Sequence, residues 1–433
     1  MGPLTGMRVV ELAHIMSGPV CGMMLADMGA DVVKVEKVPD GDDSRRFSPI
    51  MASGESASFM VVNRNKRGIG LNLKTEGGRD VLRRLLLEAD VVTENYRAGT
   101  MEKFGLGYEA LKVINPGLIY CAISGYGRSG PFGEKGGFDL IAQGMSGMMS
   151  MTGEAGREPV KAGSPVADIN SGILAALGIC AAYAAKQKTG LGQMVDTSLF
   201  EAGLQQMYWP AAAYFADGTI LPKMGSANST SAPYQVFRTA DGWINIGAAN
   251  QANYERLVEA LAVPQLKADP RFASNALRME HRLALVDILN EVLVARTTDE
   301  WMVLFDDLGL PAGPVLDIAA ALAHPQTIAR GMVVETEHPT EGRVRGMGLP
   351  IHFSDMDSAS PPASRHAPLL GEHTREVLKE SGYAEDEIDE LIRTRAVVAL
   401  ASWATYRRRS VIHRLLVVRP NPVEAGLPAK ASS

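Results

Sequence analysis

Residues 7–36, MRVVELAHIMSGPVCGMMLADMGADVVKVE, indicate the fold class of this chain. This stretch begins with one short run rich in valine, residues 7–12, and ends with a second, residues 31–36. Between them, Pro19 suits the first turn of a helix, and we expect Gly29 to stop that helix. A strand, a helix and a second strand in this order predict a βαβ unit with parallel strands.

The same alternation continues to about residue 125. Further short apolar runs predict strands, and a pattern with one apolar face predicts a helix that Thr75 can cap. These strands are residues 69–73, 91–94 and 118–124, and the helix is residues 75–89. The sequence therefore predicts an α/β fold with a Rossmann-like parallel sheet in a large domain. Its ligands belong in the loops after the carboxyl ends of the strands.

The pattern changes at a turn-rich stretch, residues 225–231. After it we expect one strand and three helices, which indicate a smaller α+β domain, and then two strand-like pieces and a final helix. The predicted elements are the strand 243–247, the helices 253–261, 282–295 and 298–308, the strand-like pieces 332–336 and 351–353, and the helix 374–380.

The last 35 or so residues are strongly basic and contain three prolines, a composition typical of a disordered extension. We expect four segments: 1–224 as the first part of the large domain, 225–325 as the small domain, 326–398 as the return to the large domain, and 399–433 as the basic extension.

Composition excludes several classes of protein. The chain has 433 residues, is 46% hydrophobic and carries a net charge of −6, which argues for two domains and against a nucleic-acid binder. Its three cysteines are far apart and belong to no metal-binding motif, so neither a disulfide framework nor a zinc site is expected. No signal peptide and no uninterrupted apolar run of about 18 residues are recognised. We therefore expect a cytoplasmic protein without a membrane span.

Two common chemistries lack their motifs. A dinucleotide site would place Glu36, at the end of the second strand, on the ribose. The first loop, however, has no GxGxxG, and Pro19 removes an amide that could bind phosphate. No GxSxG or HExxH occurs either, so serine and zinc hydrolases are disfavoured.

Asp168 is the candidate for a third chemistry. It precedes a stretch of small apolar residues, 173–179, that predicts a helix. A carboxylate at a helix amino end can be a cap, and a carboxylate can also act as a nucleophile that forms anhydrides or thioesters. The helix dipole favours the ionised form that a nucleophile needs. The two roles are compatible, although spacing alone favours the cap.

Basic residues recur beside the predicted strand ends. As a set they could hold phosphate groups, while any single lysine is more simply a solvated surface residue. The set comprises Lys37, Lys66, Arg67, Lys74, Arg97 and Lys103.

With these motifs in order, the chain resembles the class III CoA-transferases, the family of formyl-CoA, carnitine and bile-acid-inducible CoA-transferases. The resemblance covers residues 4–398 and leaves out only the basic tail. The composition of residues 225–231 resembles members that use succinyl-CoA and other dicarboxylates. The family resemblance rests on residues 4–12, 17–19, 25–36, 63–67, 71–74, 94–99, 124–127, 167–168, 188–193 and 369–374.

The resemblance implies that Asp168 is the nucleophile, forming an aspartyl anhydride and then an aspartyl-CoA thioester. It implies an acyl-CoA and a carboxylic acid as substrates, no metal, and no cofactor beyond CoA itself. It also implies an interlocked homodimer. The residues that match the family's CoA-contacting segments are Met16, Ser17, Lys37, Leu71, Asn72, Lys74, Asn95, Tyr96, Arg97 and Lys103.

Two alternatives remain open at this point. Racemases that act on α-methylacyl-CoA share the fold, but they carry a histidine where this chain has Phe138, and phenylalanine cannot move a proton. A non-catalytic acyl-CoA-binding protein is the second alternative, which the added basic tail suggests. The family's mobile loop over the substrate would correspond to residues 225–231.

Overall fold

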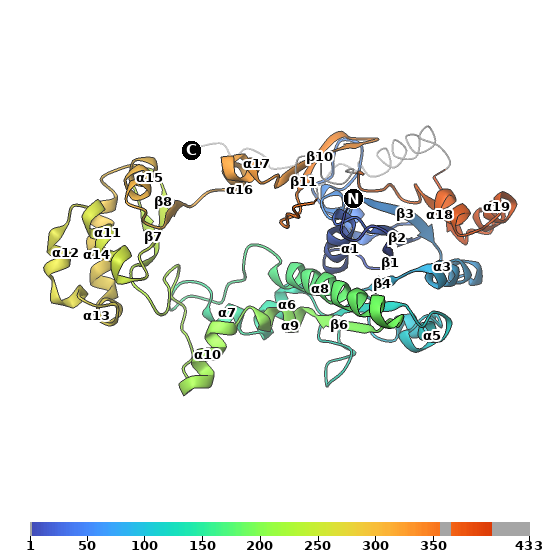
Figure 1. Cartoon of the computed structure of the whole chain (residues 1–433), viewed down its shortest axis with the longest axis horizontal. Coiled ribbons are helices and arrows are strands. Elements are labelled where there is room, and N and C mark those ends of the chain that lie inside the picture. Colours follow the sequence, from blue (N-terminus) through green and yellow to red (C-terminus); the bar gives the residue numbers. More distant parts are fainter. Residues whose placement is uncertain (1, 356–364, 401–433) are drawn as a thin grey trace, which may run out of the picture. The chain divides into compact units, whose positions relative to one another are not determined.

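The computed structural model describes residues 2–355 and 365–400, and contacts divide it into two compact units (Figure 1). The first unit comprises residues 1–138 and 167–202 together with the chain from 331 onward, and the second comprises 139–166 and 203–330. The boundary expected at residue 224 thus falls inside the second unit. The basic extension lies outside the described residues, except for its first two.

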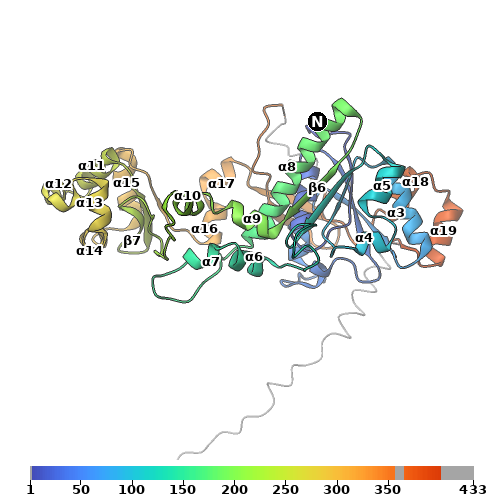
Figure 2. The same cartoon turned by 90° about the horizontal axis from the view of Figure 1, so that it is seen from below.

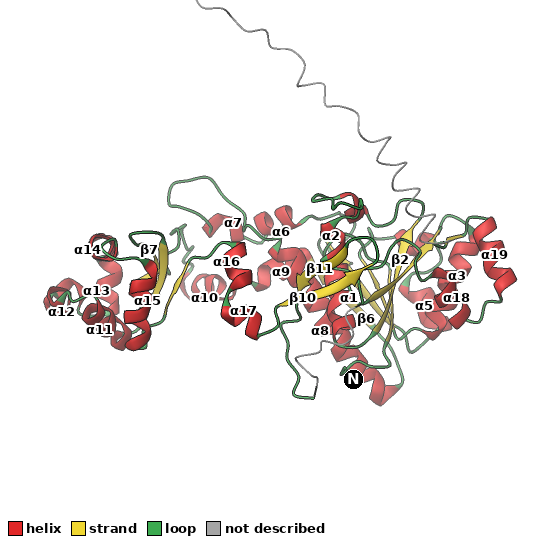
Figure 3. Ribbon diagram, turned by 90° about the horizontal axis from the view of Figure 1, so that it is seen from above, coloured by secondary structure: helices red, strands yellow, loops and turns green. Residues whose placement is uncertain are grey.

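A seven-stranded sheet forms the centre of the first unit (Figure 3). Six strands are parallel, and the short last strand pairs antiparallel at the edge. This confirms the predicted α/β class with a large, mostly parallel sheet. The order across the sheet is β12 (Val397–Val398), β3 (Lys66–Leu71), β2 (Asp31–Lys37), β1 (Arg8–Glu11), β4 (Val91–Glu94), β5 (Ile119–Ser124) and β6 (Met194–Ser198).

Helices cover both faces of this sheet. One group shares a buried core with the strands and lies together in Figure 2: α3 (Glu76–Glu88), α5 (Tyr108–Ile114), α18 (Thr374–Glu380) and α19 (Glu385–Arg393). On the other face lie α1 (Ser17–Asp27) and α8 (Val166–Thr189). The remaining short helices of this unit are η1 (Asp43–Arg46), α2 (Ala57–Met60), α4 (Thr100–Lys103) and α9 (Leu199–Gln205), which ends across the boundary.

Local signals set the ends of α1 and α3 as predicted. Gly29 follows α1 with φ +100°, a conformation that glycine adopts without steric cost. Thr75 caps α3 by accepting a hydrogen bond from the Gly78 amide at 3.1 Å. The helix buries Val81, Leu82, Leu85 and Leu86, which confirms the predicted apolar face.

The third strand was predicted too late in the chain. It was expected at residues 69–73, but β3 begins at Lys66 and ends at Leu71. Its first two residues are charged and yet buried, because each is paired with a carboxylate: Lys66 with buried Glu11 and Arg67 with partly exposed Asp31. A strand that starts with buried charges has no apolar signature, so the sequence pattern missed it.

In the second unit, a three-stranded antiparallel sheet packs with helices around its own core. The predicted strand and three helices are confirmed within two residues at each end. The elements are α6 (Asp139–Met145), α7 (Met148–Met151), α10 (Tyr208–Asp217), β7 (Tyr234–Arg238), β8 (Trp243–Gly247), α11 (Gln251–Ala260), α12 (Pro264–Ala268), η2 (Pro270–Phe272), α13 (Asn275–Glu280), α14 (Arg282–Leu293), α15 (Thr298–Asp307), β9 (Ala312–Pro314), α16 (Ile318–Ala323) and α17 (Pro325–Ala329).

By length and composition alone, α8 is the one helix among the described residues that could cross a membrane. No apolar run of that length was expected, so this is a difference from the sequence analysis. It is weak evidence for a span, since core helices pass the same test. Seven residues of α8 are buried within the protein, among them Gly172, Ala175 and Ile179.

A hairpin of β10 (Val333–His338) and β11 (Gly342–Met347) returns the chain to the first unit. The predicted strand at 332–336 is thus confirmed, but the piece at 351–353 is not a strand. His338, at the end of β10, is 3% exposed and its ring lies 5.2 Å from that of His366.

Burial of His338, reinforced by the charge of His366, lowers its pKa to about 4. The unfolded chain therefore binds a proton there below about pH 6.5 that the folded chain refuses until about pH 4, so stability falls as pH falls through this window. Between pH 7 and pH 4.5, this one histidine should lower the free energy of unfolding by about 2–3 kcal/mol, and His338→Gln should abolish that decrease. Urea unfolding at pH 7 and pH 4.5 measures it, and an unchanged pH dependence in the variant would contradict it.

Candidate active site at the switch point of the sheet

The strand order reverses between β1 and β4, since β2 and β3 continue to one side of β1 and β5 and β6 to the other side of β4. Diverging loops at such a point leave a crevice at the carboxyl ends of the strands, where ligands of open α/β sheets bind. The loop after β1 runs through His14 to Met16, and the loop after β4 begins at Asn95. The candidate site is therefore built around these two loops.

Hydrogen bonds join the two loops directly. The His14 amide donates to Asn95 Oδ1 at 2.9 Å, and Asn95 Nδ2 donates to the His14 carbonyl at 2.8 Å. The rings of His14 and Tyr96 lie 5.7 Å apart. Burial lowers the pKa of His14, against an opposing effect of Asp42, so the neutral imidazole is favoured.

Asp168 lies in the first turn of α8 and is half-buried. Four residues later, on the same face of the helix, Gly172 touches the start of α1: a methyl group there would lie 2.4 Å from the Ser17 carbonyl oxygen. Only glycine permits this close approach. Asp168 therefore lies one helical turn before the point where α8 packs against the start of α1.

Several of the residues that were predicted to contact CoA lie around the loop between β1 and α1. Met16 is the residue before α1, and buried Ser17 is its first residue. Lys37, at the end of β2, lines one cleft with His14 and Tyr96. The ammonium group of Lys37 lies 2.8 Å from the Asp43 carboxylate, and an incoming phosphate would compete for it.

The residues after β3 lie next to Lys37. Leu71 pairs with Lys37 in the sheet register, but its side chain is fully buried, so only its backbone is available to a ligand. The backbone amide of Asn72 donates a hydrogen bond to the Ala396 carbonyl at 2.8 Å, just before β12. Three further cations assigned to CoA have exposed side chains: Lys74 and Arg97 on the loops after β3 and β4, and Lys103 at the end of α4.

Two of the six cations first considered for phosphate do not lie at strand carboxyl ends. Lys66 and Arg67 begin β3 instead. Lys66 is fully buried and ion-paired to Glu11 at 2.8 Å, and Arg67 pairs with Asp31 at 2.6 Å. Lys66 therefore neutralises a buried carboxylate and Arg67 a partly exposed one, and the expectation that they could hold phosphates at the strand carboxyl ends is wrong.

Glu36 is likewise occupied by partners within the protein and cannot bind the ribose of a dinucleotide. Its carboxylate receives two hydrogen bonds of 2.7 Å from Arg45 and a third, 2.9 Å long, from the Asp42 amide. With Glu36 2% exposed, no oxygen is left for a ribose. This observation agrees with the absence of a GxGxxG loop.

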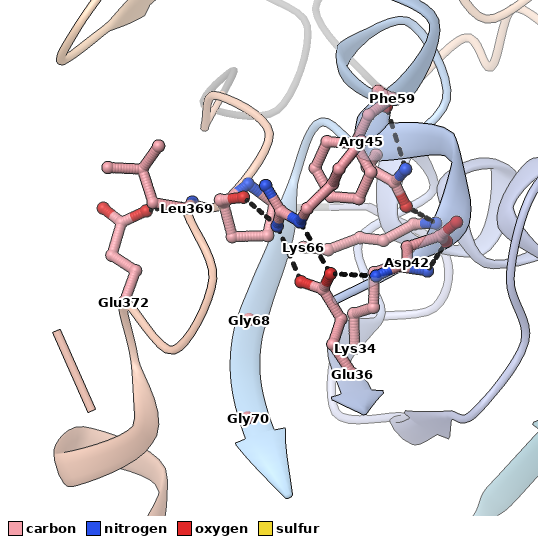
Figure 4. A network of polar contacts seen from close by, with 12 residues as sticks. Lys34, Glu36, Asp42, Arg45, Phe59, Lys66, Gly68, Gly70, Leu369 and Glu372 are labelled. Carbon is pink, nitrogen blue, oxygen red and sulfur yellow. Dashed lines mark hydrogen bonds and ion pairs between the residues drawn. The ribbon is translucent and has the colours of Figure 1, made fainter. Parts of the chain in front are cut away.

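A buried charged network that was not predicted lies beneath the site and includes Glu36, Arg45, Lys34, Asp42 and Lys66 (Figure 4). Lys34 is fully buried and contacts carboxylate oxygens of Glu11 and Asp42, each at 3.0 Å. Arg45 stacks on Phe59, 3.7 Å from the ring centre. The one signal in the sequence is Lys34, a charged residue between the valines of β2, which must find partners once buried.

These features define an α/β protein with a ligand crevice at the switch point of its sheet and a carboxylate at a helix start beside it. Residues 4–374 match CoA-transferase family III. The chain is 40% identical to an acyl-CoA transferase of Fusarium pseudograminearum over 400 residues, which cover 89% of this chain and 86% of the relative.

Two further comparisons agree. The chain is 36% identical to succinyl-CoA:glutarate CoA-transferase of Mus musculus over 395 residues, covering 90% and 89% of the two chains. A crystal structure of a CAIB/BAIF family protein from Brucella suis superimposes with a TM-score of 0.79 at 40% identity, covering 88% of this chain and 99% of the other. This chain belongs to CoA-transferase family III and is an enzyme of that class.

Proposed function

We propose that this enzyme moves CoA from succinyl-CoA, or a similar acyl-CoA, to a second carboxylic acid, with Asp168 as the nucleophile. The observation that carries the proposal is the position of Asp168 at the start of α8, one turn before the contact between Gly172 and Ser17. A helix amino end favours a carboxylate in its ionised, nucleophilic form. The adjacent switch-point crevice is where a nucleotide-bearing substrate binds in this class of sheet.

The proposed chemistry needs four acyl transfers and no net change of charge. The Asp168 carboxylate attacks the donor thioester, and the CoA thiolate leaves, forming a mixed anhydride. The thiolate then attacks the Asp168 carbonyl and releases the donor acid, giving an aspartyl-CoA thioester. The acceptor carboxylate displaces CoA to form a second anhydride, and the thiolate attacks its acceptor carbonyl. New acyl-CoA leaves and the Asp168 carboxylate is restored.

CoA itself is proposed to lie along the strand-end loops. Lys37, Arg97 and Lys103 are exposed there and can meet phosphate groups, which bind lysine and arginine through charge-assisted hydrogen bonds. The loop amides near Met16 and Ser17 lie at the start of α1, where a helix favours an anion. Leu71 and Asn72 would contribute backbone contacts.

The acceptor is proposed to be a short dicarboxylate. The similarity to a succinyl-CoA:glutarate CoA-transferase supports succinyl-CoA as the donor and a five-carbon diacid as an acceptor. A screen of succinyl-, acetyl- and glutaryl-CoA against mono- and dicarboxylic acids of two to six carbons, followed by chromatography of the CoA esters, tests this. CoA binding without exchange across the whole panel would instead support the non-catalytic alternative.

We also propose an interlocked homodimer. On α8, opposite its buried face, Ile173 and Leu177 are 40% and 65% exposed. On α10, Trp209 and Phe215 are more than 80% exposed. Apolar side chains of this size are seldom left to water in such numbers on single helices, and a second copy of the chain would cover them.

Interlocked chains cannot separate without unfolding, so we expect the dimer to survive dilution. Mass photometry at nanomolar concentration should give twice the chain mass of 46.4 kDa, with no monomer after a day. A monomer population that grows on dilution of folded enzyme would show that the two chains are not linked.

A further inference from the structure

The loop after β1 holds a strained residue. Ile15 has φ +69°, in the left-handed region that β-branched residues avoid because the side chain crowds the backbone. Such strain persists only where the surroundings enforce it, and it is concentrated at functional sites. Ile15 lies between His14 and Met16, in the loop at the switch point of the sheet.

Two side chains from neighbouring strand ends hold this loop. Asn95, after β4, exchanges two hydrogen bonds with the His14 backbone. Asp42, after β2, accepts the Ile15 amide on its two carboxylate oxygens at 3.1 and 3.2 Å. The strained residue is therefore fixed from both sides of β1, and among the described residues Asp42 is the acceptor of the Ile15 amide.

Asp42 is itself rigidly placed. It is 2% exposed, its carboxylate lies 3.0 Å from the Lys34 ammonium, and Ser44 donates to it through its amide and its hydroxyl at 2.9 and 2.8 Å. Although burial alone would raise the pKa of Asp42, Lys34 and the Ser44 hydrogen bonds lower it well below the usual range. Asp42 is thus a fixed anion across the physiological pH range.

Lys34 connects this anchor to the other end of the same loop. Its ammonium also donates to the Ala13 carbonyl at 2.9 Å and to Glu11 at 3.0 Å. One side of the loop is therefore bound at Ala13 through Lys34 and at Ile15 through Asp42. Figure 4 shows Lys34 and Asp42 together within the buried network.

We propose that Asp42 is a positioning residue for CoA transfer: by holding the Ile15 amide, it keeps the loop before α1 in the strained shape that the site requires. The inference rests on the proposed function, because that loop leads into Ser17, which packs against Gly172 one helical turn after Asp168. Asp42 touches neither substrate nor Asp168 in this role. Its effect passes through the backbone of residues 13–17.

The test compares Asp42→Ala, the double variant Ile15→Gly/Asp42→Ala, and Asp40→Asn as a control in the same loop. Asp40 is exposed and 3.8 Å from Arg46, with no contact to Ile15. Asp42→Ala should lower kcat about 100-fold, as for a misplacement of about 1 Å. Amide exchange in the peptide covering residues 13–18 should become at least about tenfold faster, by mass spectrometry.

Glycine takes positive φ without cost, so the double variant should recover about tenfold of the lost kcat, and Asp40→Asn should match the wild type. Wild-type exchange and kcat in folded Asp42→Ala would overturn the proposal. A loss that Ile15→Gly does not recover would also overturn it, because Asp42 would then act only as the counter-ion of Lys34.

If Asp42→Ala does not fold, Asp42→Glu replaces it: the charge beside Lys34 is kept while the carboxylate is displaced by one methylene, and the same exchange and kcat changes are expected at about tenfold. The exchange measurement needs no turnover. A wild-type enzyme that transfers no CoA would therefore refute the proposed function, while the peptide 13–18 still decides whether Asp42 holds the loop.

Discussion

Replacing Asp168 with alanine is expected to abolish CoA transfer, with a loss of at least about 10⁴-fold in kcat, the scale seen when a covalent nucleophile is removed. A loss of that size corresponds to about 5.5 kcal/mol of transition-state stabilisation. The structural role of an acid in a first helical turn is about 0.3–1 kcal/mol. The size of the loss in kcat therefore distinguishes a nucleophile from a residue that only caps the helix.

The control for this variant is Asp217→Ala, which removes an exposed acid whose carboxylate accepts the Thr219 amide at 2.9 Å. It should leave kcat unchanged. The melting temperature and the affinity for CoA, by calorimetry, should differ little between Asp168→Ala and the wild type. Measurable turnover in folded Asp168→Ala would assign the chemistry to another residue.

The second large effect is expected at Gly172, where the added methyl group of alanine would lie 2.4 Å from the Ser17 carbonyl oxygen and 3.0 Å from the Val20 Cβ. A backbone oxygen cannot rotate away, so α8 must shift from α1 and carry Asp168 with it. In a helix, alanine is favoured over glycine by about 1 kcal/mol. Overpacking costs about 1–3 kcal/mol, and a contact this short belongs at the upper end.

We therefore expect Gly172→Ala to be destabilised by about 1–2 kcal/mol in urea unfolding, the net of these two terms, and to lose about 100-fold in kcat because Asp168 is displaced. Gly313→Ala is the matched control, since an added methyl group there meets nothing within 4 Å. Equal stability and activity in Gly172→Ala would show that α8 and α1 are not in the close contact described.

Sequence periodicity predicted most of the first unit because its signals are local. The strands at residues 31–36 and 91–94, the Thr75 cap and the stop at Gly29 each depend on neighbouring residues alone. Lys66 and Arg67 show where this fails. Their charges are neutralised by Glu11 and Asp31, distant in sequence, so an isolated reading of residues 66–71 cannot recognise a buried strand.

The candidate site was also predictable only in part. Asp168 was found from its place before an apolar helix, and the resemblance to a family supplied its role. Its position near the start of α1 depends on Gly172 meeting Ser17, a contact between segments about 150 residues apart that no pattern in either segment encodes. Asp42 was missed for a related reason: its partners are Ile15, in the loop after β1, and Lys34, in the middle of β2.

Trapping the covalent intermediate shows whether Asp168 is the nucleophile. The enzyme is mixed with succinyl-CoA and then with hydroxylamine, which attacks anhydrides and thioesters, and its peptides are analysed by mass spectrometry. We expect inactivation that requires the donor and a hydroxamate on Asp168. A hydroxamate on a different acid, or full transfer activity with no modified peptide, would contradict Asp168 as the nucleophile.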